Sequence, residues 1–196
     1  GSAASLVWPR SCDESAPRGA HRSMRSQIRA WRHRIVASLL LLAGLAGPAS
    51  SGWRAGVARE TITPPQPMPM AGYASRGAKH AEGTLTDLFA KALVLQDDQG
   101  NRAALVTLDL VGVERILAES ICERLGTKYD LERRQIVLAC SHTHTGPVVA
   151  KNLRPMHYEM LDEQDRRLVN EYAGLLEERI ETAVGRAIDQ LAPAEV

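Results

Sequence analysis

Two histidines separated by one residue, His142 and His144, are the side chains of this sequence whose types and spacing best suit chemistry. They directly follow residues 135–140, a short apolar run that predicts a β-strand. If the chain kept the strand direction, the period of two would place both imidazoles on one face and point Thr143 away. Neutral imidazole is a common zinc ligand, and catalytic zinc keeps three protein ligands and a water. The spacing therefore indicates a metal or catalytic centre at the end of a strand.

The residues around the pair are compatible with such a centre. The hydroxyl groups of Ser141 and Thr145 could hold the rings by hydrogen bonds, and Gly146-Pro147 would turn the chain just after them. An H-x-H pair alone fits two hydrogen-bonded surface histidines equally well. A metallo-β-lactamase would place Asp where Gly146 stands, and the sequence has no H-E-x-x-H of the zincin type, so both classes are disfavoured.

Proline and glycine mark a long loop that precedes the pair. Residues 53–62 predict a strand that ends at Thr63-Pro64-Pro65, because proline removes ladder donors. Long irregular loops in compact domains tend to be functional, so we expect the following segment to form a wall of the site. Its turn-forming residues are Pro67, Pro69, Gly72, Gly77 and Gly83. Residues 89–95 and 103–111 are rich in β-formers and flank a polar turn, which predicts an antiparallel hairpin.

Helix and strand patterns alternate after the hairpin. Residues 136–139 lack polar alternation, which predicts a strand covered on both faces. Residues 163–191 repeat apolar side chains at helical spacing and predict a long amphipathic helix. Residues 114–125 predict a helix with one apolar face and a C-terminal cap at Gly126. The apolar face of that helix would consist of Ile116, Leu117, Ile121 and Leu125.

The order of these elements predicts an α/β fold. We expect a mixed sheet with an N-terminal β-hairpin, followed by β-α-β-α order. Ligands in open α/β sheets gather beyond the carboxyl ends of the strands. The histidine pair would lie at such an end.

The N-terminal residues carry the pattern of an export signal. Residues 24–51 hold a basic stretch, the apolar run 35–46 and small residues suited to a signal peptidase. The apolar run is too short for the roughly 20 residues of a membrane-spanning helix, so we expect no permanent membrane span in the mature chain. We expect residues 1–23 to be a leader that is not native, the mature chain to begin near residue 52, and the protein to be secreted or periplasmic.

Composition favours a folded domain. Apolar residues make up 44% and charged residues 24%, as in ordinary globular proteins, and a net charge of +1 gives no reason to expect a nucleic-acid partner.

Export would permit Cys122 and Cys140 to form a disulfide, whereas their places on a helix and at a strand end also suit two buried thiols. His80 is expected to be solvated, and His157 to begin a charged approach to the last helix.

Residues 140–147, with the sequence CSHTHTGP, resemble the G-T-H-T-H-S-G-P string of the neutral/alkaline non-lysosomal ceramidases. Three other stretches agree in the same order. Residues 55–65 are similar to the family's opening strand that ends in D-I-T-P, residues 70–74 resemble its M-G-Y-A loop, and residues 87–92 resemble its approach to an R-A-[FL] strand. The resemblance covers residues 55–150.

This resemblance implies the N-terminal part of a larger catalytic domain. The family's reaction would be zinc-dependent hydrolysis of the amide of ceramide, N-acylsphingosine, to sphingosine and a fatty acid. By motif position, His142 would be a zinc ligand, and His144 would orient the substrate or stabilise the developing oxyanion. Gly72, in the segment that matches M-G-Y-A, would line the same pocket through its backbone. Asp109, near a strand end, is a candidate to support the metal site by position alone, and a satisfied structural carboxylate is the alternative.

The departures from the family pattern limit what the resemblance implies. Val148 and Val149 stand where the family commonly has glycines, which stiffens the loop beyond the histidines. The family's other zinc ligands, a second His, a Glu and a Tyr, and its catalytic Ser belong to later segments, so we expect the fragment alone to be inactive. The alternatives are a non-catalytic exported binding module with the same fold, or a metal-dependent esterase or amidase for another substrate. An exposed apolar face on the last helix would favour the module, and an aliphatic cleft would argue against a polar substrate.

Overall fold

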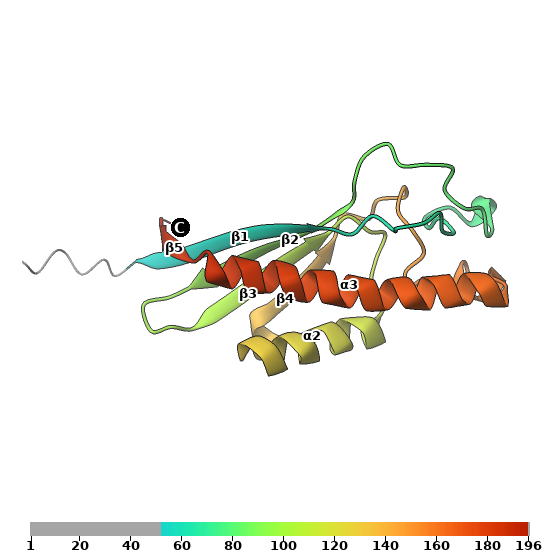
Figure 1. Ribbon diagram of the computed structural model, residues 1–196. Coiled ribbons are helices and arrows are strands. Elements are labelled where there is room, and N and C mark those ends of the chain that lie inside the picture. The colour runs from blue at the N-terminus through green and yellow to red at the C-terminus, as the bar shows by residue number, and fades with distance from the viewer. Residues whose placement is uncertain (1–51, 196) are drawn as a thin grey trace, which may run out of the picture. The chain divides into compact units, whose positions relative to one another are not determined.

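The computed structural model describes residues 52–195, and their elements confirm the predicted α/β fold (Figure 1). The predicted leader and signal peptide lie outside these residues. The strands and helices are β1 (Trp53–Thr61), β2 (Phe89–Gln96), β3 (Arg102–Leu108), α2 (Arg115–Tyr129), β4 (Ile136–Cys140), α3 (Glu163–Asp189) and β5 (Ala192–Ala194). Short 3-10 turns lie at Ala74–Arg76, Arg133–Gln135 and Tyr158–Met160. None of the helices between residues 52 and 195 is long and apolar enough to cross a membrane.

The strands form one mixed sheet in the order β4-β3-β2-β1-β5. The predicted hairpin is confirmed, because β2 and β3 pair antiparallel with Ala92 opposite Val106. Strands β3 and β4 pair in parallel, with Leu108 opposite Cys140, and α2 makes the connection between them. The carboxyl ends of β3 and β4 therefore meet at one end of the sheet, where the loops that follow them lie side by side.

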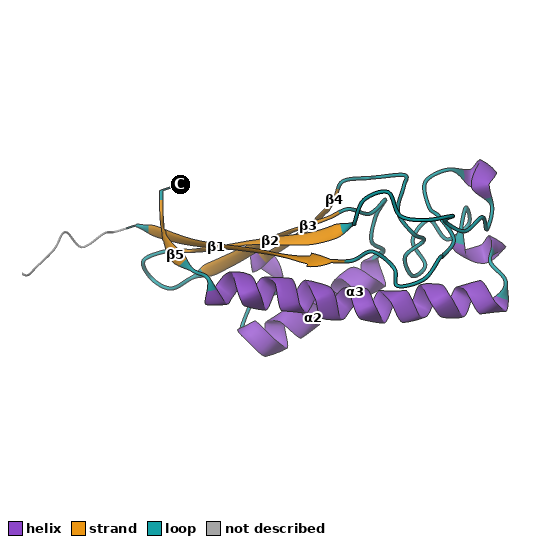
Figure 2. Ribbon diagram, turned by 45° about the horizontal axis from the view of Figure 1, so that its top comes forward, coloured by secondary structure: helices purple, strands orange, loops and turns teal. Residues whose placement is uncertain are grey.

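Both long helices pack on the same face of the sheet (Figures 1 and 2). The backbone of α3 passes very close to β1, since a Cβ added at Gly56 would collide with the carbonyl oxygen of Ala187. Alternate residues of the strands point away from the helices. Four of them face each other across β1, β2, β3 and β4 and form an apolar strip, here called the open-face row: Val57, Leu93, Leu105 and Val137.

The open-face row corrects the prediction for β4. The apolar run 136–139 predicted cover on both faces, but β4 lies at the edge of the sheet, and Val137 is 55% exposed. Val57 is 62% exposed and Leu105 is 38% exposed. The prediction fails because both helices pack on the opposite face, and no described element covers this one. The exposed apolar surface is thus on the sheet rather than on the last helix.

Helix α2 is longer than its pattern predicts. It continues past Gly126 to Tyr129, and Asp130, in the left-handed region with φ of 56°, takes the cap position and donates its N–H to the carbonyl of Gly126. Ile116 is 67% exposed and does not belong to the buried face, which consists of Leu117, Ile121, Cys122 and Leu125. The extra turn forms because its side chains bind α3.

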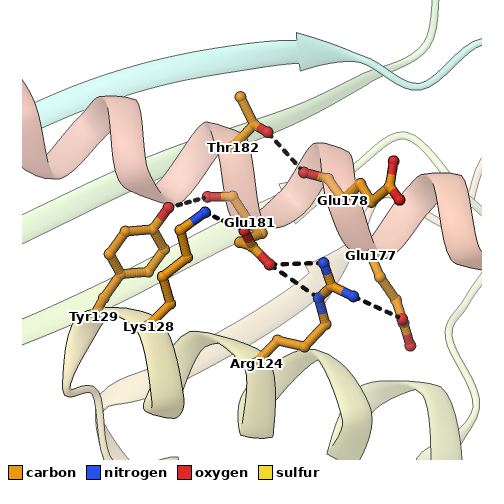
Figure 3. Close-up of polar contacts among 7 residues, drawn as sticks. All are labelled: Arg124, Lys128, Tyr129, Glu177, Glu178, Glu181 and Thr182. Atoms are coloured by element: carbon orange, nitrogen blue, oxygen red, sulfur yellow. Dashed lines mark hydrogen bonds and ion pairs between the residues drawn. The ribbon is translucent and has the colours of Figure 1, made fainter.

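A polar cluster fixes α2 to α3 (Figure 3). Arg124 donates to Glu181 Oε2 through Nη2 at 2.7 Å, Lys128 pairs with the same carboxylate, and the Tyr129 hydroxyl donates to the carbonyl of Glu181 at 3.1 Å. The hydrogen bond from Lys128, with help from Arg124, lowers the pKa of Glu181. The Glu181 side chain is 16% exposed, whereas those of Arg124 and Lys128 are 39% and 56% exposed, so solvent screens these ion pairs in part.

The long amphipathic helix is confirmed as α3, whose apolar stripe is buried. The stripe consists of Val169, Tyr172, Leu176, Ile180, Val184 and Ala187. Figure 1 shows the N-terminal half of α3 extending beyond the sheet, under the loops. There the Tyr172 hydroxyl donates to the carbonyl of Ile62 at 2.6 Å and fixes the point at which β1 enters the long loop. Burial raises the pKa of this phenol.

Candidate active site

The chain leaves the sheet immediately before the histidine pair. Strand β4 ends at Cys140, and His142 has a φ of 59°, in the left-handed region that residues other than glycine rarely adopt. The pair therefore does not continue the strand direction. The rings still meet, with centroids 4.9 Å apart and planes at 68°. Such a backbone costs about 1–3 kcal/mol and persists where the surrounding structure enforces it, often at functional sites.

The ring of His142 is oriented by a backbone carbonyl. Its Nδ1 lies 2.8 Å from the carbonyl oxygen of Val111, in the loop after β3. A carbonyl oxygen only accepts, so Nδ1 carries the proton, and in the neutral ring Nε2 keeps its lone pair. Metal-binding histidines typically donate their second ring nitrogen to a carbonyl or carboxylate in this way. His142 can thus act as a ligand through Nε2. The role of Val111 in orienting the ring was not predicted from the sequence.

His144 packs against the long loop. Its ring contacts Tyr73 edge to face, with centroids 4.6 Å apart. Arg76 donates to the carbonyl of His144 and, at 2.7 Å, to that of Ala71, so one guanidinium ties the histidine segment to the loop. The loop was predicted to form a wall of the site, and it does so around His144.

Gly72 packs tightly against His144. A Cβ added at Gly72 would lie 2.5 Å from both Cβ and Cγ of His144, and the φ of Gly72 is +108°. The position therefore requires glycine for its conformation and for its packing. The N–H of Gly72 donates to His157 Nε2 at 3.1 Å. The structure thus brings Gly72 and His144 together. The N–H of Gly72, however, is already bonded to His157.

His157, expected to begin a charged approach to the last helix, is buried. It is 1% exposed, and its Nδ1 has no hydrogen-bond partner among the described residues. Burial, and then the nearby charge of Arg76, lowers the pKa of His157. The neutral imidazole can accept the Gly72 N–H through Nε2.

The other predicted side chains do not support the histidine rings. Ser141 is exposed, and the Thr145 hydroxyl lies 2.8 Å from that of Thr143. The Asp109 carboxylate accepts from the backbone N–H of Phe89 at 3.0 Å and pairs with Lys91. Among the hydrogen bonds described for residues 52–195, none joins Ser141, Thr145 or Asp109 to either imidazole through a side chain. The contacts of Asp109 match the structural alternative.

A cavity of about 460 Å³ opens beside the histidine motif. It lies between two parts of the long loop and residues 145–147, which directly follow His144. Its apolar lining includes Met68, Met70, Leu85, Leu88 and Pro147. Backbone bridges from Met70 to Pro147 and from Pro69 to His80 fix the loop. His80 also binds Asp165 of α3 at 2.8 Å, so it anchors the loop rather than standing free in solvent as expected.

The two cysteines of the described residues do not pair, and they form no metal cluster with other side chains. Cys122 and Cys140 are free thiols, and burial raises the pKa of both. Between residues 52 and 195, no group of three or more His, Cys, Asp and Glu side chains is placed to hold a metal ion.

Comparison with known proteins gives the family. The model of the neutral/alkaline non-lysosomal ceramidase N-terminal region matches residues 53–196. The chain belongs to this ceramidase family. It is 34% identical over 115 residues to neutral ceramidase of Drosophila pseudoobscura pseudoobscura, and 31% identical over 113 residues to neutral ceramidase of Drosophila melanogaster. Each match covers 56% of this chain and 16% of the relative.

Solved ceramidase structures share the fold. A ceramidase complexed with C2 has a TM-score of 0.58 and 24% identity, and neutral ceramidase from Pseudomonas aeruginosa has a TM-score of 0.57 and 22% identity. Each match covers 72% of this chain and 22% of the solved chain. The resemblance inferred from the histidine string is confirmed, and the chain spans about a fifth of the solved ceramidases it matches.

Proposed function

We propose that this chain is the N-terminal part of a zinc-dependent amide hydrolase of neutral ceramidase type, with His142 as a zinc ligand. The observation that carries the proposal is the hydrogen bond from His142 Nδ1 to the Val111 carbonyl. It leaves Nε2 with its lone pair, as a zinc-binding histidine requires. Bound zinc would act as a Lewis acid and activate water for attack on the amide.

His144 has a second role in this proposal. Arg76 binds its backbone carbonyl, Gly72 packs against its Cβ and Cγ, and its ring stands edge to face against Tyr73 and His142. An imidazole fixed next to the metal ligand can donate a hydrogen bond to the oxygen on which negative charge develops. Fixed donors of this kind stabilise a transition state more than mobile ones, because they need no reorganisation.

The cavity favours a lipid amide over a polar substrate. It begins at residues 145–147, immediately after His144, and methionine, leucine and proline side chains line much of it. An aliphatic acyl chain would be removed from water there, at about 25 cal/mol per Å² of buried apolar surface. We therefore propose N-acylsphingosine as the substrate, cleaved to sphingosine and a fatty acid.

The proposed protein is longer than the described part and is exported. By family resemblance, the remaining zinc ligands and the catalytic Ser come from later segments, since a catalytic zinc needs three protein ligands. The described residues alone would then be inactive. Residues 24–51 would direct the protein to a secreted or periplasmic location.

The test compares the 196-residue chain with the protein encoded when the reading frame is extended downstream. Zinc content is measured by elemental analysis, and hydrolysis is measured with N-acylsphingosine. We expect the extended protein to hold zinc and to cleave the lipid, and His142→Ala to remove both properties. His80→Gln is the matched control, because it replaces a histidine outside the motif and keeps a donor for Asp165. Zinc retained in full by His142→Ala would refute the ligand assignment.

One observation favours a second candidate, a non-catalytic exported interaction module. The open-face row leaves Val57, Leu105 and Val137 exposed on three of the strands. An extended protein that binds no zinc, yet keeps the fold, would support this candidate. Cleavage of short polar amides but not of N-acylsphingosine would instead indicate a different substrate for the same metal site.

A further inference from the structure

A buried histidine outside the zinc motif connects the long loop to the segment before α3. His157 is 1% exposed and accepts the N–H of Gly72, a residue 85 positions earlier in the chain. Its Nδ1 is buried without a hydrogen-bond partner among the described residues. An unpartnered buried polar group costs about 1–3 kcal/mol, whereas an apolar side chain of similar size would pack there without that cost. The presence of an imidazole therefore requires a reason other than packing.

The reason lies in what Gly72 contacts. Gly72 is wedged against the Cα, Cβ and Cγ atoms of His144, so any movement of its backbone changes the space available to that side chain. Its φ of +108° is uncommon, and the hydrogen bond to His157 fixes the direction of its N–H in this conformation. Arg76 restrains the same loop through the carbonyls of Ala71 and His144. His157, Gly72 and His144 thus form a continuous line of contacts.

We propose that His157 is a positioning residue, which holds the Gly72 backbone against His144 by accepting its N–H at Nε2. This inference rests on the proposed function of His144 in the hydrolase. His157 touches neither the proposed metal ligand nor, in this proposal, the substrate. It acts through Gly72 by limiting the positions that the His144 imidazole can adopt.

The protonation state of His157 is part of this arrangement. Only the neutral ring with its proton on Nδ1 can accept at Nε2, because the protonated ring would present a donor to the donor of Gly72. The lowered pKa of His157, caused by burial and by Arg76, favours the neutral ring. The partnerless Nδ1–H is the cost of placing the lone pair on the side of Gly72.

Two variants of the chain separate positioning from packing. His157→Leu fills a similar volume and removes the acceptor. His157→Gln can place its side-chain carbonyl oxygen near the position of Nε2 and accept from Gly72 again. In the 196-residue chain, hydrogen exchange of the Gly72 amide and the chemical shifts of the His144 ring report the link without any need for activity. In the extended protein, kcat, KM and zinc content report its consequence.

We expect His157→Leu to speed exchange of the Gly72 amide about tenfold, the factor that accompanies loss of one hydrogen bond, and to shift the His144 resonances. In the extended protein, kcat should fall about tenfold while KM and zinc content change little, because the ligand is His142 and not His144. His157→Gln should restore both the exchange rate and kcat. The melting temperature of each variant identifies any loss of the fold.

The proposal is overturned if His157→Leu leaves Gly72 exchange and the His144 resonances unchanged, or if the leucine and glutamine variants behave alike. Failure of the proposed function gives a different pattern. The extended protein would then lack zinc and activity even with His157 intact, while the Gly72 and His144 signals would still respond to the leucine variant and recover in the glutamine variant.

Discussion

Replacing Gly72 by alanine should damage the candidate site more than any other single methyl group added to the long loop. The new Cβ would lie 2.5 Å from Cβ and Cγ of His144 and 2.8 Å from its Cα. Ordinary carbon contacts are about 3.5–4.0 Å, so the overlap is about 1 Å or more with atoms close to the backbone. Side-chain rotation moves Cγ but neither Cα nor Cβ, so either the loop or the histidine segment must move.

The free energy that Gly72→Ala costs has two contributions. A residue other than glycine held in a sparsely populated backbone region costs about 1–3 kcal/mol. An overpacked contact costs about another 1–3 kcal/mol. The sum of about 2–6 kcal/mol is a large part of the 5–15 kcal/mol that stabilises a typical domain. The loop should therefore leave its place before the domain unfolds, which limits the global loss and frees His144.

Two glycines of the same loop provide matched controls. Gly77 also has a positive φ, +56°, but a Cβ there meets no atom within 4 Å, so Gly77→Ala measures backbone strain alone. Gly83 has neither feature, and Gly83→Ala should have almost no effect. Urea unfolding gives the free energy of each variant, and the His144 ring resonances report the site. Equal losses and unchanged His144 resonances for Gly72→Ala and Gly77→Ala would refute the contact between Gly72 and His144.

Two further predictions concern the scaffold. Gly56→Ala should lower the free energy of unfolding in urea by about 3 kcal/mol, because the new Cβ would collide with the backbone of α3. The control Gly174→Ala, at an exposed helix position with open space, should raise the free energy of unfolding by about 1 kcal/mol. Unchanged stability of Gly56→Ala would contradict the close packing of β1 and α3. Glu181→Gln should cost about 1 kcal/mol at pH 7. The lowered pKa of Glu181 means that its ionised form contributes stability above its ordinary pKa of 4.5, which is lost as pH falls through the folded value, so the deficit should shrink in acid. Glu178→Gln, on the same helix with no described ion pair, is its control, and a deficit independent of pH would refute the role of the charge.

The elements of the fold could be predicted because each has a local pattern. The β-forming residue types of residues 89–95 predict the strand, and the period of 3.6 in residues 163–191 indicates which side chains of the helix face the core. The exact end of α2 could not be predicted from such a pattern. Glycine is the residue type that commonly ends a helix, so Gly126 was the expected cap. Lys128 and Tyr129 in the following turn bind Glu181, and the helix continues to Tyr129. Tertiary contacts of this kind leave no local trace in the sequence.

In the candidate site, too, some residues could be predicted from a local motif, whereas others depend on tertiary contacts. The histidine string indicated His142 and His144 as candidates, and the structure packs Gly72 of the loop against His144. The carbonyl of Val111 could not have been found, because every residue carries a carbonyl and only the fold aims one at Nδ1. His157 resembled a surface residue in its charged neighbourhood, and its burial depends on contacts with a loop far away in sequence.

The open-face row has a consequence for the solution behaviour of the described part of the chain. Val57, Leu105 and Val137 present aliphatic surface on a sheet whose edge strand, β4, has neighbours on one side only. Water-exposed aliphatic patches of this kind favour association, increasingly so in salts that are excluded from protein surfaces. Dilution would then lower the apparent melting temperature, as for any protein stabilised by self-association. The open-face row thus gives the uncovered side of the sheet an apolar strip, against which the apolar surface of another layer would pack.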